Sequence, residues 1–452
     1  MQDVFRHIEE HQQEAIDDLI RLCRLPSVSA EGRAIGETAE LVSEMLRSLG
    51  FRTQIIPKAD GHPVVHGELA GASTEKTILF YNHYDVQPAE PLDLWSSPPF
   101  EPALRDDKLY ARGVCDNKGN IAARLAAIRA FQAVRGQVPL SLKFCIEGDE
   151  EIGSPGIEPF VEEQRQLLAA DACLWEGGGV NWRGQPQITL GAKGLLYVEL
   201  EACGANRDAH SSYATVVPNP AWRLAWALTT LKDSAENILI DGFYAQARAS
   251  SPQERAAVEA MPSQEKDTAR SLGLDGFLKG VRGLDYRLRH LFEPTCNIAG
   301  LGSGYQGPGT KTVLPARATA KLDFRLVPDQ EPEDVLEKLQ RHLREKGYGD
   351  VEVRCLVAER PARTPVDHPF VGLVCEAARQ VYGQEPVLIP SMAGTGPLYP
   401  FVDTLGLPTA DFGVGYPESR IHAPDESIRL ADFLRGAKHI AAVLQRFAAA
   451  EA

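Results

Sequence analysis

The amino-acid sequence predicts an α/β fold: an open, mostly parallel sheet with helices on both faces, into which a ferredoxin-like α+β domain is inserted. Three observations predict it. Strand-like runs alternate with helical patterns up to about residue 176, the order then becomes βαββαβ, and a proline-rich linker leads into two final helices. Alternating strands and helices are typical of parallel sheets, and βαββαβ is the split motif of ferredoxin-like domains.

The first part of the chain opens with helices. Residues 1–50 carry two amphipathic helix patterns, and Gly50 ends the second. Strand-like runs follow at 51–57, 63–70 and 76–85, then a helix at 118–134, a strand at 140–148, a helix from about residue 157 and a short strand at 172–175. Ligands of open α/β sheets gather at the carboxyl ends of strands, so functional side chains are expected where these runs end.

The second part begins after the glycine run 177–179. It consists of a strand at 195–204, a helix at 219–231, an irregular insertion, strands at 295–301 and 316–328, a helix at 332–347 and a strand at 350–358. The linker 360–369 then returns the chain to helices at 370–383 and 431–448. Two domains are expected: residues 1–188 together with 364–452, and an inserted domain at 189–363.

Charge and hydropathy exclude several classes of partner. The chain has 452 residues and a formal net charge of −15, without the clustered Lys and Arg that phosphate binding needs. Its N-terminus lacks the charged and apolar regions of a secretory signal, and no window approaches the ~20 apolar residues of a membrane span. We therefore expect a cytoplasmic protein that binds neither nucleic acid nor a membrane.

Histidine and acidic residues stand at the predicted strand ends. His83 and Asp85 end one strand, Glu176 follows another, and Asp116 lies in a glycine-flanked loop directly before a helix. The H-x-D pair alone is equally typical of a half-buried histidine linked to a carboxylate. Its meaning depends on the other acidic sites.

The segment 147–154, EGDEEIGS, is the most informative. Glu147, Asp149, Glu150 and Glu151 put four carboxylates into five residues after an apolar strand, where repulsion is costly without a counter-cation. A solvated acidic turn is the alternative. Adjacent Glu150 and Glu151 point in different directions in an extended chain, so one can bind a metal while the other addresses a water.

His422 lies in a turn-rich segment near the C-terminus, where a lone histidine would be interpreted as a surface residue. Together with the carboxylates and His83, however, it completes a set of nitrogen and oxygen donors. Such a set suits divalent ions, with zinc the first choice and manganese the second.

Four motifs in order, NHYDVQP, RGVCDNKG, EGDEEIGS and RIHAPDE, resemble the superfamily of dinuclear metallopeptidases that includes aminoacylase, acetylornithine deacetylase, succinyl-diaminopimelate desuccinylase and carnosinase. The resemblance covers nearly the whole chain and implies two divalent metal ions per subunit. Its implied roles are as follows: His83 and Glu176 bind one ion, Glu151 and His422 the other, Asp116 bridges both, Asp85 orients His83, and Glu150 is the general base. The superfamily commonly has Asp where this chain has Glu176; Asp171, at the start of that strand, is a poorer candidate.

The phrases YNHYDVQP, LYARGVCDNKG, EEIGSP and GPGTKTVLPARATAKLDFRLVP are similar to the cytosolic nonspecific dipeptidase and carnosinase branch. The resemblance implies that His210 of the inserted domain reaches the active site of the partner subunit, and that Thr312 and Arg325 hold the substrate carboxylate. Thr395 matches a carboxylate-binding hydroxyl only loosely, since the branch's glycine-glycine-serine pattern is absent. From the residues alone, His210 could be a strand-end surface residue, and Arg325 could pair with Asp323.

The reaction implied is hydrolysis of dipeptides or similar short peptides with a free carboxylate. A water activated by two metals attacks the amide, Glu150 takes its proton, and His210 stabilises the oxyanion from across a homodimer in which the inserted domain is the lid or dimerisation domain. An N-acyl-amino-acid deacylase or a carboxypeptidase on the same scaffold is the nearest alternative. A non-catalytic metal-binding scaffold is the alternative from another class.

Overall fold

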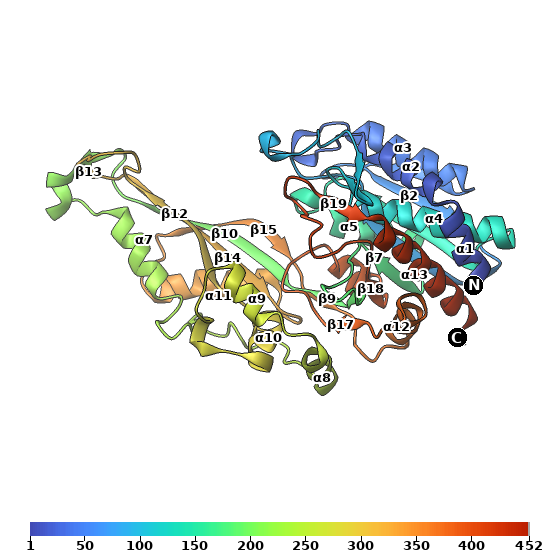
Figure 1. Ribbon diagram of the computed structural model, residues 1–452. Coiled ribbons are helices and arrows are strands. Elements are labelled where there is room, and N and C mark those ends of the chain that lie inside the picture. The colour runs from blue at the N-terminus through green and yellow to red at the C-terminus, as the bar shows by residue number, and fades with distance from the viewer. Residues whose placement is uncertain (451–452) are drawn as a thin grey trace.

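Two separate sheets organise the molecule, as the computed structural model of residues 1–450 shows (Figure 1). The larger sheet has eight strands. Its centre is parallel, because β3 pairs in parallel with both β6 and β7, and β7 with β18, whereas β1, β2 and the β18–β8 contact are antiparallel. In sheet order its strands are β1 (Arg52–Ile56), β2 (Val64–Leu69), β6 (Leu140–Glu147), β3 (Ser73–His83), β7 (Ala172–Trp175), β18 (Thr409–Asp411), β8 (Gln187–Thr189) and β17 (Val387–Ile389). This confirms the open, mostly parallel sheet.

Helices cover both faces of this sheet because side chains alternate along its strands. In β3, Ile78 and Phe80 join the core on one face, and Leu79 and Tyr81 join the core on the other. The first face carries α1 (Gln2–Glu10), α2 (Gln12–Cys23), α3 (Ile35–Ser48), α4 (Lys118–Arg135), α12 (Pro369–Tyr382) and α13 (Leu430–Ala449). The second carries α5 (Ile157–Glu163), α6 (Arg165–Leu168) and a π-helical turn (Pro400–Thr404).

The N-terminal segment departs from the two predicted helix patterns, since it forms three helices. His11 adopts φ −109° and ψ 23°, outside the helical region, and so separates α1 from α2. Both helices then pack on α4, each by its own apolar face. The turn at a polar residue leaves no glycine or proline signal in the sequence.

The inserted domain has the predicted order of elements: β10 (Gly194–Cys203), α7 (Pro220–Thr229), β12 (Asn297–Ser303), β14 (Arg317–Leu326), α11 (Pro332–Glu345) and β15 (Glu352–Glu359). Its antiparallel sheet has the order β12-β14-β10-β15, which places the second and third strands on one side of the first and the fourth on the other. That arrangement confirms the ferredoxin-like domain. A separate core of residues from β10, β14, α7 and α11 supports it.

A short antiparallel pair marks where the chain passes between the two parts. β9 (Gly191–Ala192) leads into the inserted domain, and β16 (Ala362–Arg363) leads out of it beside β9. The irregular insertion after α7 contains α8 (Pro252–Ala260), α9 (Glu265–Ser271) and α10 (Gly283–Phe292), and α8 packs against β17. The exact boundaries, 1–188 with 364–452 and 189–363, stay a proposal.

Several short elements have no counterpart in the sequence prediction. They include a three-stranded sheet of β4 (Ala103–Arg105), β5 (Lys108–Tyr110) and β19 (Ser427–Arg429), and a distal pair of β11 (Ala209–His210) and β13 (Val313–Leu314). Each strand has only two or three residues, too few for a period to emerge. Across residues 1–450, no helix combines the length and apolarity that a membrane crossing requires.

Candidate metal centre and substrate cavity

The candidate site lies at the carboxyl edge of the central parallel strands. His83 ends β3, Glu147 ends β6, and Glu176 directly follows β7. Because these strands are neighbours and parallel, their ends meet at one edge. The loop before α4 brings Asp116 to the same edge, and a 3-10 turn (Glu150–Ile152) after β6 brings Glu150 and Glu151.

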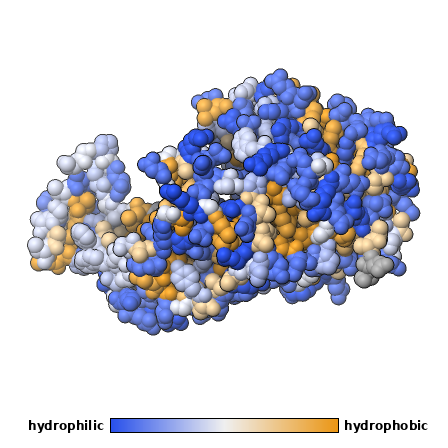
Figure 2. Space-filling model, turned by 60° about the horizontal axis from the view of Figure 1, so that its bottom comes forward, coloured by the Kyte–Doolittle hydropathy of each residue, from blue (hydrophilic) through white to orange (hydrophobic). Residues whose placement is uncertain are grey.

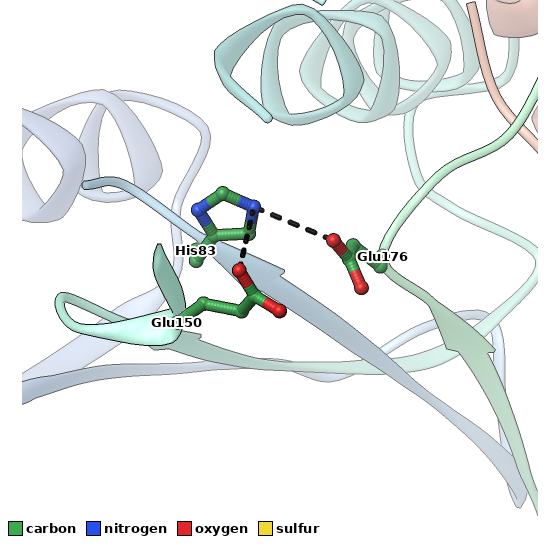
Figure 3. A group of neighbouring side chains, drawn as sticks. All are labelled: His83, Glu150 and Glu176. Atoms are coloured by element: carbon green, nitrogen blue, oxygen red, sulfur yellow. Dashed lines mark ion pairs between the residues drawn. The ribbon is translucent and has the colours of Figure 1, made fainter. Parts of the chain in front are cut away.

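His83 is at the centre of one group of ligand atoms (Figure 3). Its buried Nε2 lies 2.9 Å from Oδ1 of Asp116, 3.5 Å from Oε1 of Glu176 and 4.0 Å from Oε2 of Glu150. In Figure 3 the two glutamates point toward the ring from different elements. A ring nitrogen and three carboxylates thus converge within the reach of one ion.

His422 forms the second part of the site from the opposite side of Asp116. Its Nε2 lies 3.3 Å from Oδ2 of Asp116 and 2.9 Å from Oε2 of Glu151. The two oxygens of Asp116 therefore face two different histidines. His422 reaches this place with φ 61°, an uncommon left-handed conformation for a histidine.

Electrostatics indicate that the cluster needs a counter-cation. Burial and the nearby charge of Glu176 raise the pKa of Glu150 well above its usual value. Burial raises the pKa of Glu176 and Glu151 too, although hydrogen bonds with His83 and His422 oppose the shift. Hydrogen bonds with Asp116 and Glu151 raise the pKa of His422 to about 10. In the metal-free protein, protons thus offset the carboxylate charges.

This donor set fits divalent metal ions. Two histidines and four carboxylates converge, and two ligand groups, His83 with Glu150 and Glu176, and His83 with Asp116 and Glu151, each have their atoms within 4.8 Å of one another. Nitrogen and oxygen donors of this kind are those of zinc and manganese sites. Ions at these positions would replace the protons as the source of positive charge.

Asp85 lies behind the ligands. One of its oxygens is 3.3 Å from Nδ1 of His83, and its carboxylate accepts hydrogen bonds from the backbone N–H groups of Glu150 at 3.2 Å and Glu151 at 3.0 Å. β3 ends at His83, so Asp85 is placed by the following loop and not by strand alternation. Its position is that of a residue that orients the histidine and both glutamates.

Glu426 was not singled out in the sequence, although it belongs to the RIHAPDE motif. Its buried carboxylate accepts hydrogen bonds from the backbone N–H groups of Gly113, Cys115 and Asp116, and pairs with Arg112 at 2.8 Å. It therefore holds the loop that presents Asp116. Only the fold brings positions more than 300 residues apart together, so the motif was the one available signal.

Lys58 contacts the acidic segment 147–154, and the sequence analysis did not single it out. Its fully buried ammonium lies 3.1 Å from Glu147 and 2.5 Å from Asp149. Tyr81 and Ser154 donate hydrogen bonds to the other oxygen of Glu147. Of the four carboxylates in EGDEEIGS, these two therefore have a protein cation, and Glu150 and Glu151 face the site.

A cavity of about 600 Å³ opens beside the cluster. Such a volume suits a small-molecule ligand. Thr395 lines it, and the guanidinium Nη1 of Arg325 donates a hydrogen bond to the Thr395 hydroxyl at 2.7 Å. Arg325 also lies 3.5 Å from Asp323, so the ion pair expected as an alternative is present too. The structure thus brings together two of the three residues expected at the substrate carboxylate.

His210 and Thr312 lie elsewhere. Their side chains are 3.3 Å apart: His210 ends β11, and Thr312 directly precedes β13. In Figure 1, β13 lies at the narrow end of the molecule, far from β7. Both are exposed. Within this one chain they do not contribute to the cavity.

Comparison with known families gives one match that spans most of the chain. The model of "Peptidase family M20/M25/M40" matches residues 79–446. These residues include all six positions of the metal cluster.

Individual relatives agree along nearly their whole length. The Beta-Ala-His dipeptidase of Rattus norvegicus is 26% identical, covering 98% of this chain and 94% of the relative, and the Cys-Gly metallodipeptidase dug1 of Schizosaccharomyces pombe is 27% identical, covering 96% of each. Among solved structures, an M20 family metallo-carboxypeptidase from Sulfolobus solfataricus is 39% identical with a TM-score of 0.91, covering 97% of this chain and 100% of that one.

Proposed function

This chain belongs to peptidase family M20/M25/M40, and we propose from that membership and from its site that it is a dinuclear metallopeptidase for dipeptides or similar short peptides. The match confirms the superfamily that the four motifs resemble. The observation that carries the proposal is the position of Asp116, whose two oxygens face His83 on one side and His422 on the other. A carboxylate between two histidines is the arrangement that a pair of bridged ions requires.

In this proposal His83 and Glu176 hold one ion, Glu151 and His422 hold the other, and Asp116 bridges them. The distances support the division, since Glu176 is near His83 and Glu151 is near His422. Zinc is the first choice and manganese the second, because both accept mixed imidazole and carboxylate ligands. Asp85 would fix the ring of His83 through its other nitrogen.

Two bound ions would supply a water of lowered pKa and polarise the scissile carbonyl. Glu150 would act as the general base: its carboxylate takes the proton of the attacking water and returns it to the nitrogen of the leaving amine. The side chain is free for this role because Asp85 accepts from its backbone N–H and leaves the carboxylate facing the cavity.

Arg325 and Thr395 would receive the free carboxylate of the substrate. The guanidinium offers a planar fork of donors, and it donates a hydrogen bond to the hydroxyl of Thr395, which lines the cavity. This favours substrates that end in a carboxylate near the scissile bond.

We propose a homodimer in which His210 and Thr312 reach the cavity of the partner subunit. The sheet of the inserted domain ends in β12, an edge strand without a neighbour within residues 1–450, and Ile298 and Leu301 on it are exposed. Trp222 and Trp226 of α7 are stacked and more than half exposed. Hydrophobic atoms also appear at the narrow end in Figure 2. Open edges and exposed apolar groups favour association.

A carboxypeptidase is the second candidate function. It is favoured by the metallo-carboxypeptidase from Sulfolobus solfataricus, which is 39% identical to this chain, whereas the two dipeptidases named above are 26% and 27% identical. Both activities need a free substrate carboxylate. They differ in what lies on the amino side of the scissile bond. An N-acyl-amino-acid deacylase differs at the same position. A cytoplasmic location stays a proposal from the sequence.

The test is a substrate panel on the purified protein, with metal content measured before and after chelation. Dipeptides, tripeptides and N-acetyl amino acids should be supplied at equal concentration. We expect about two divalent ions per chain, loss of activity on chelation, recovery on adding zinc or manganese, and the highest kcat/KM for dipeptides. Preference for tripeptides would favour the carboxypeptidase, and preference for N-acetyl amino acids the deacylase. A metal-loaded protein inactive on all three classes would indicate a scaffold.

A further inference from the structure

Asp411 is a buried carboxylate at the substrate cavity that the sequence motifs do not include. It is the last residue of β18, next to Trp175 of β7 across the parallel pair. Its side chain lines the cavity although the residue is only 9% exposed. Its Oδ1 accepts no hydrogen bond from any group in residues 1–450. An oxygen that is buried, unpartnered and at a cavity wall is a feature that needs a ligand to explain it.

No protein cation in the described chain pairs with this carboxylate. Arg124 runs beneath the same strand ends, but its guanidinium donates to the backbone oxygens of Tyr81, Trp175 and Glu176 and to the side chain of Asn82. Asp411 forms no ion pair within 4.0 Å across residues 1–450. A buried charge without a partner is costly, and burial and the nearby charge of Glu176 raise the pKa of Asp411 well above its usual value. A ligand cation beside the carboxylate would stabilise its charged form.

The metal ions of the proposed function do not supply that cation. Asp411 is absent from both groups of convergent ligand atoms in residues 1–450. Two divalent ions would bring four positive charges, which equal the four negative charges of Asp116, Glu150, Glu151 and Glu176 around them. The charge of the two ions is therefore already matched by their own ligands without Asp411.

The walls around Asp411 suit a positively charged group. The described lining of the cavity contains no Lys or Arg. Trp182 offers an exposed ring that is 69% accessible, and Gln187 offers a side-chain oxygen. Aromatic faces and carbonyl oxygens are the usual companions of ammonium ions. Thr395 lines the same cavity, and its hydroxyl accepts a hydrogen bond from Arg325.

We propose that Asp411 binds a cationic nitrogen of the substrate residue on the amino side of the scissile bond, in the first place the free α-ammonium of a dipeptide. This inference rests on the proposed function, because it assumes that the substrate carboxylate lies at Arg325 and Thr395. The two charged ends of a dipeptide then match the two ends of the cavity: its ammonium lies at Asp411, and its carboxylate lies at Arg325 and Thr395. An acetylated or longer peptide lacks the ammonium at that position, so Asp411 selects dipeptides.

The experiment compares Asp411→Asn with the unmodified protein, both loaded with metal. Ala-Ala and N-acetyl-Ala-Ala serve as the matched substrates. Asp171→Asn is the control variant, since Asp171 directly precedes β7, at the end of the strand away from the site, and accepts a backbone hydrogen bond from Thr77. We expect Asp411→Asn to lower kcat/KM for Ala-Ala by roughly 10- to 100-fold, because one hydrogen bond to a charged group is lost. The kcat/KM for N-acetyl-Ala-Ala should not change. Metal content should stay equal in all three proteins.

Equal losses on both substrates would overturn the inference, and so would the absence of any loss on the two peptides that carry an ammonium group, Ala-Ala and N-acetyl-Lys-Ala. A second pair, N-acetyl-Lys-Ala and N-acetyl-norleucyl-Ala, separates the α-ammonium from a side-chain ammonium: a loss confined to the lysine peptide supports the same subsite with the side chain as its occupant. If the unmodified protein cleaves none of these peptides, the proposed function fails, and calorimetry still tests the subsite. Alaninamide should then bind the metal-loaded protein more tightly than the Asp411→Asn variant, and equal binding would refute the role of Asp411.

Discussion

The buried carboxylate of Glu426 accepts a hydrogen bond from the backbone N–H of Asp116 at 3.1 Å. The last sequence motif thereby holds the loop of the second motif, and Arg112 pairs with the same carboxylate. The position of the bridging residue therefore depends on a residue that does not itself face the cavity.

Glu426→Gln should weaken both folding and metal binding. The amide cannot accept from Arg112 and three backbone N–H groups as the carboxylate does, and loss of one partner of a buried pair costs about 3–5 kcal/mol. Loosening of the Asp116 loop should reduce metal affinity by roughly 10- to 100-fold. Urea unfolding and metal titration measure the two effects. The control is Glu68→Gln, whose pair with Arg52 is exposed and should contribute under about 1 kcal/mol. Unchanged metal affinity in Glu426→Gln would contradict the positioning role.

Glu150→Gln and Glu151→Gln should separate catalysis from metal binding. The two residues are adjacent, but only Glu151 lies at 2.9 Å from His422. We expect Glu150→Gln to retain both ions and to lose roughly 10²- to 10⁴-fold in kcat, as removal of a general base does. Glu151→Gln should lose one ion, and added metal should restore part of its activity. Metal analysis measures the ions bound per chain, and steady-state kinetics measures kcat. Near-normal turnover by Glu150→Gln would refute the role of Glu150 as general base.

The sequence motifs contain the side chains that converge at the candidate metal site, but the sequence did not predict which residues hold them in place. His83, Glu150 and Glu176 stand at strand ends that apolar runs reveal, so their convergence follows from parallel pairing. Lys58 and Glu426 carry no such signal. Lys58 meets Glu147 across 89 positions, and a lone lysine in a loop is interpreted as a surface residue until the fold buries it.

Short strands were missed for a related reason. β18 has three residues, too few to display alternation, yet it is the strand that places Asp411 at the cavity. By contrast, the βαββαβ order of the ferredoxin-like domain was predicted, because β10 and β14 are ten residues long and alternate clearly. Prediction from sequence therefore succeeded where periodicity is long and failed where tertiary neighbours define an element.

The metal-free protein should lose stability as pH rises. The pKa of His422 is raised to about 10 in the folded state by Asp116 and Glu151, against about 6.5 when unfolded. The folded state then binds more protons, so this contribution is complete below about pH 6.5 and is lost as pH rises through about 10. The raised pKa values of Glu151 and Glu176 also make the folded protein less stable as pH rises, and their effect begins at a lower pH than that of His422.

Thermal unfolding of chelated protein between pH 6.5 and 10 measures this effect. We expect the melting temperature to fall with pH, and to fall less in His422→Asn, which lacks the titrating ring. Metal binding should release protons and strengthen as pH rises, because the ion replaces them. A melting temperature of the chelated protein that rises across this range would contradict the expected loss of stability.

His210→Ala and Glu150→Gln should each be nearly inactive alone and active when mixed. His210 lies on the distal pair β11 and β13, away from the cavity of its own chain, so its contribution to catalysis requires a second chain. A hybrid dimer has one site with Glu150 from one subunit and His210 from the other. Random exchange should restore roughly a quarter of normal activity, because half of the dimers are hybrids with one intact site in two. His11→Ala, which alters an exposed histidine of the N-terminal helices, is the control and should keep full activity unmixed. Absence of recovery after subunit exchange has been verified by mass spectrometry would show that His210 does not act across the dimer.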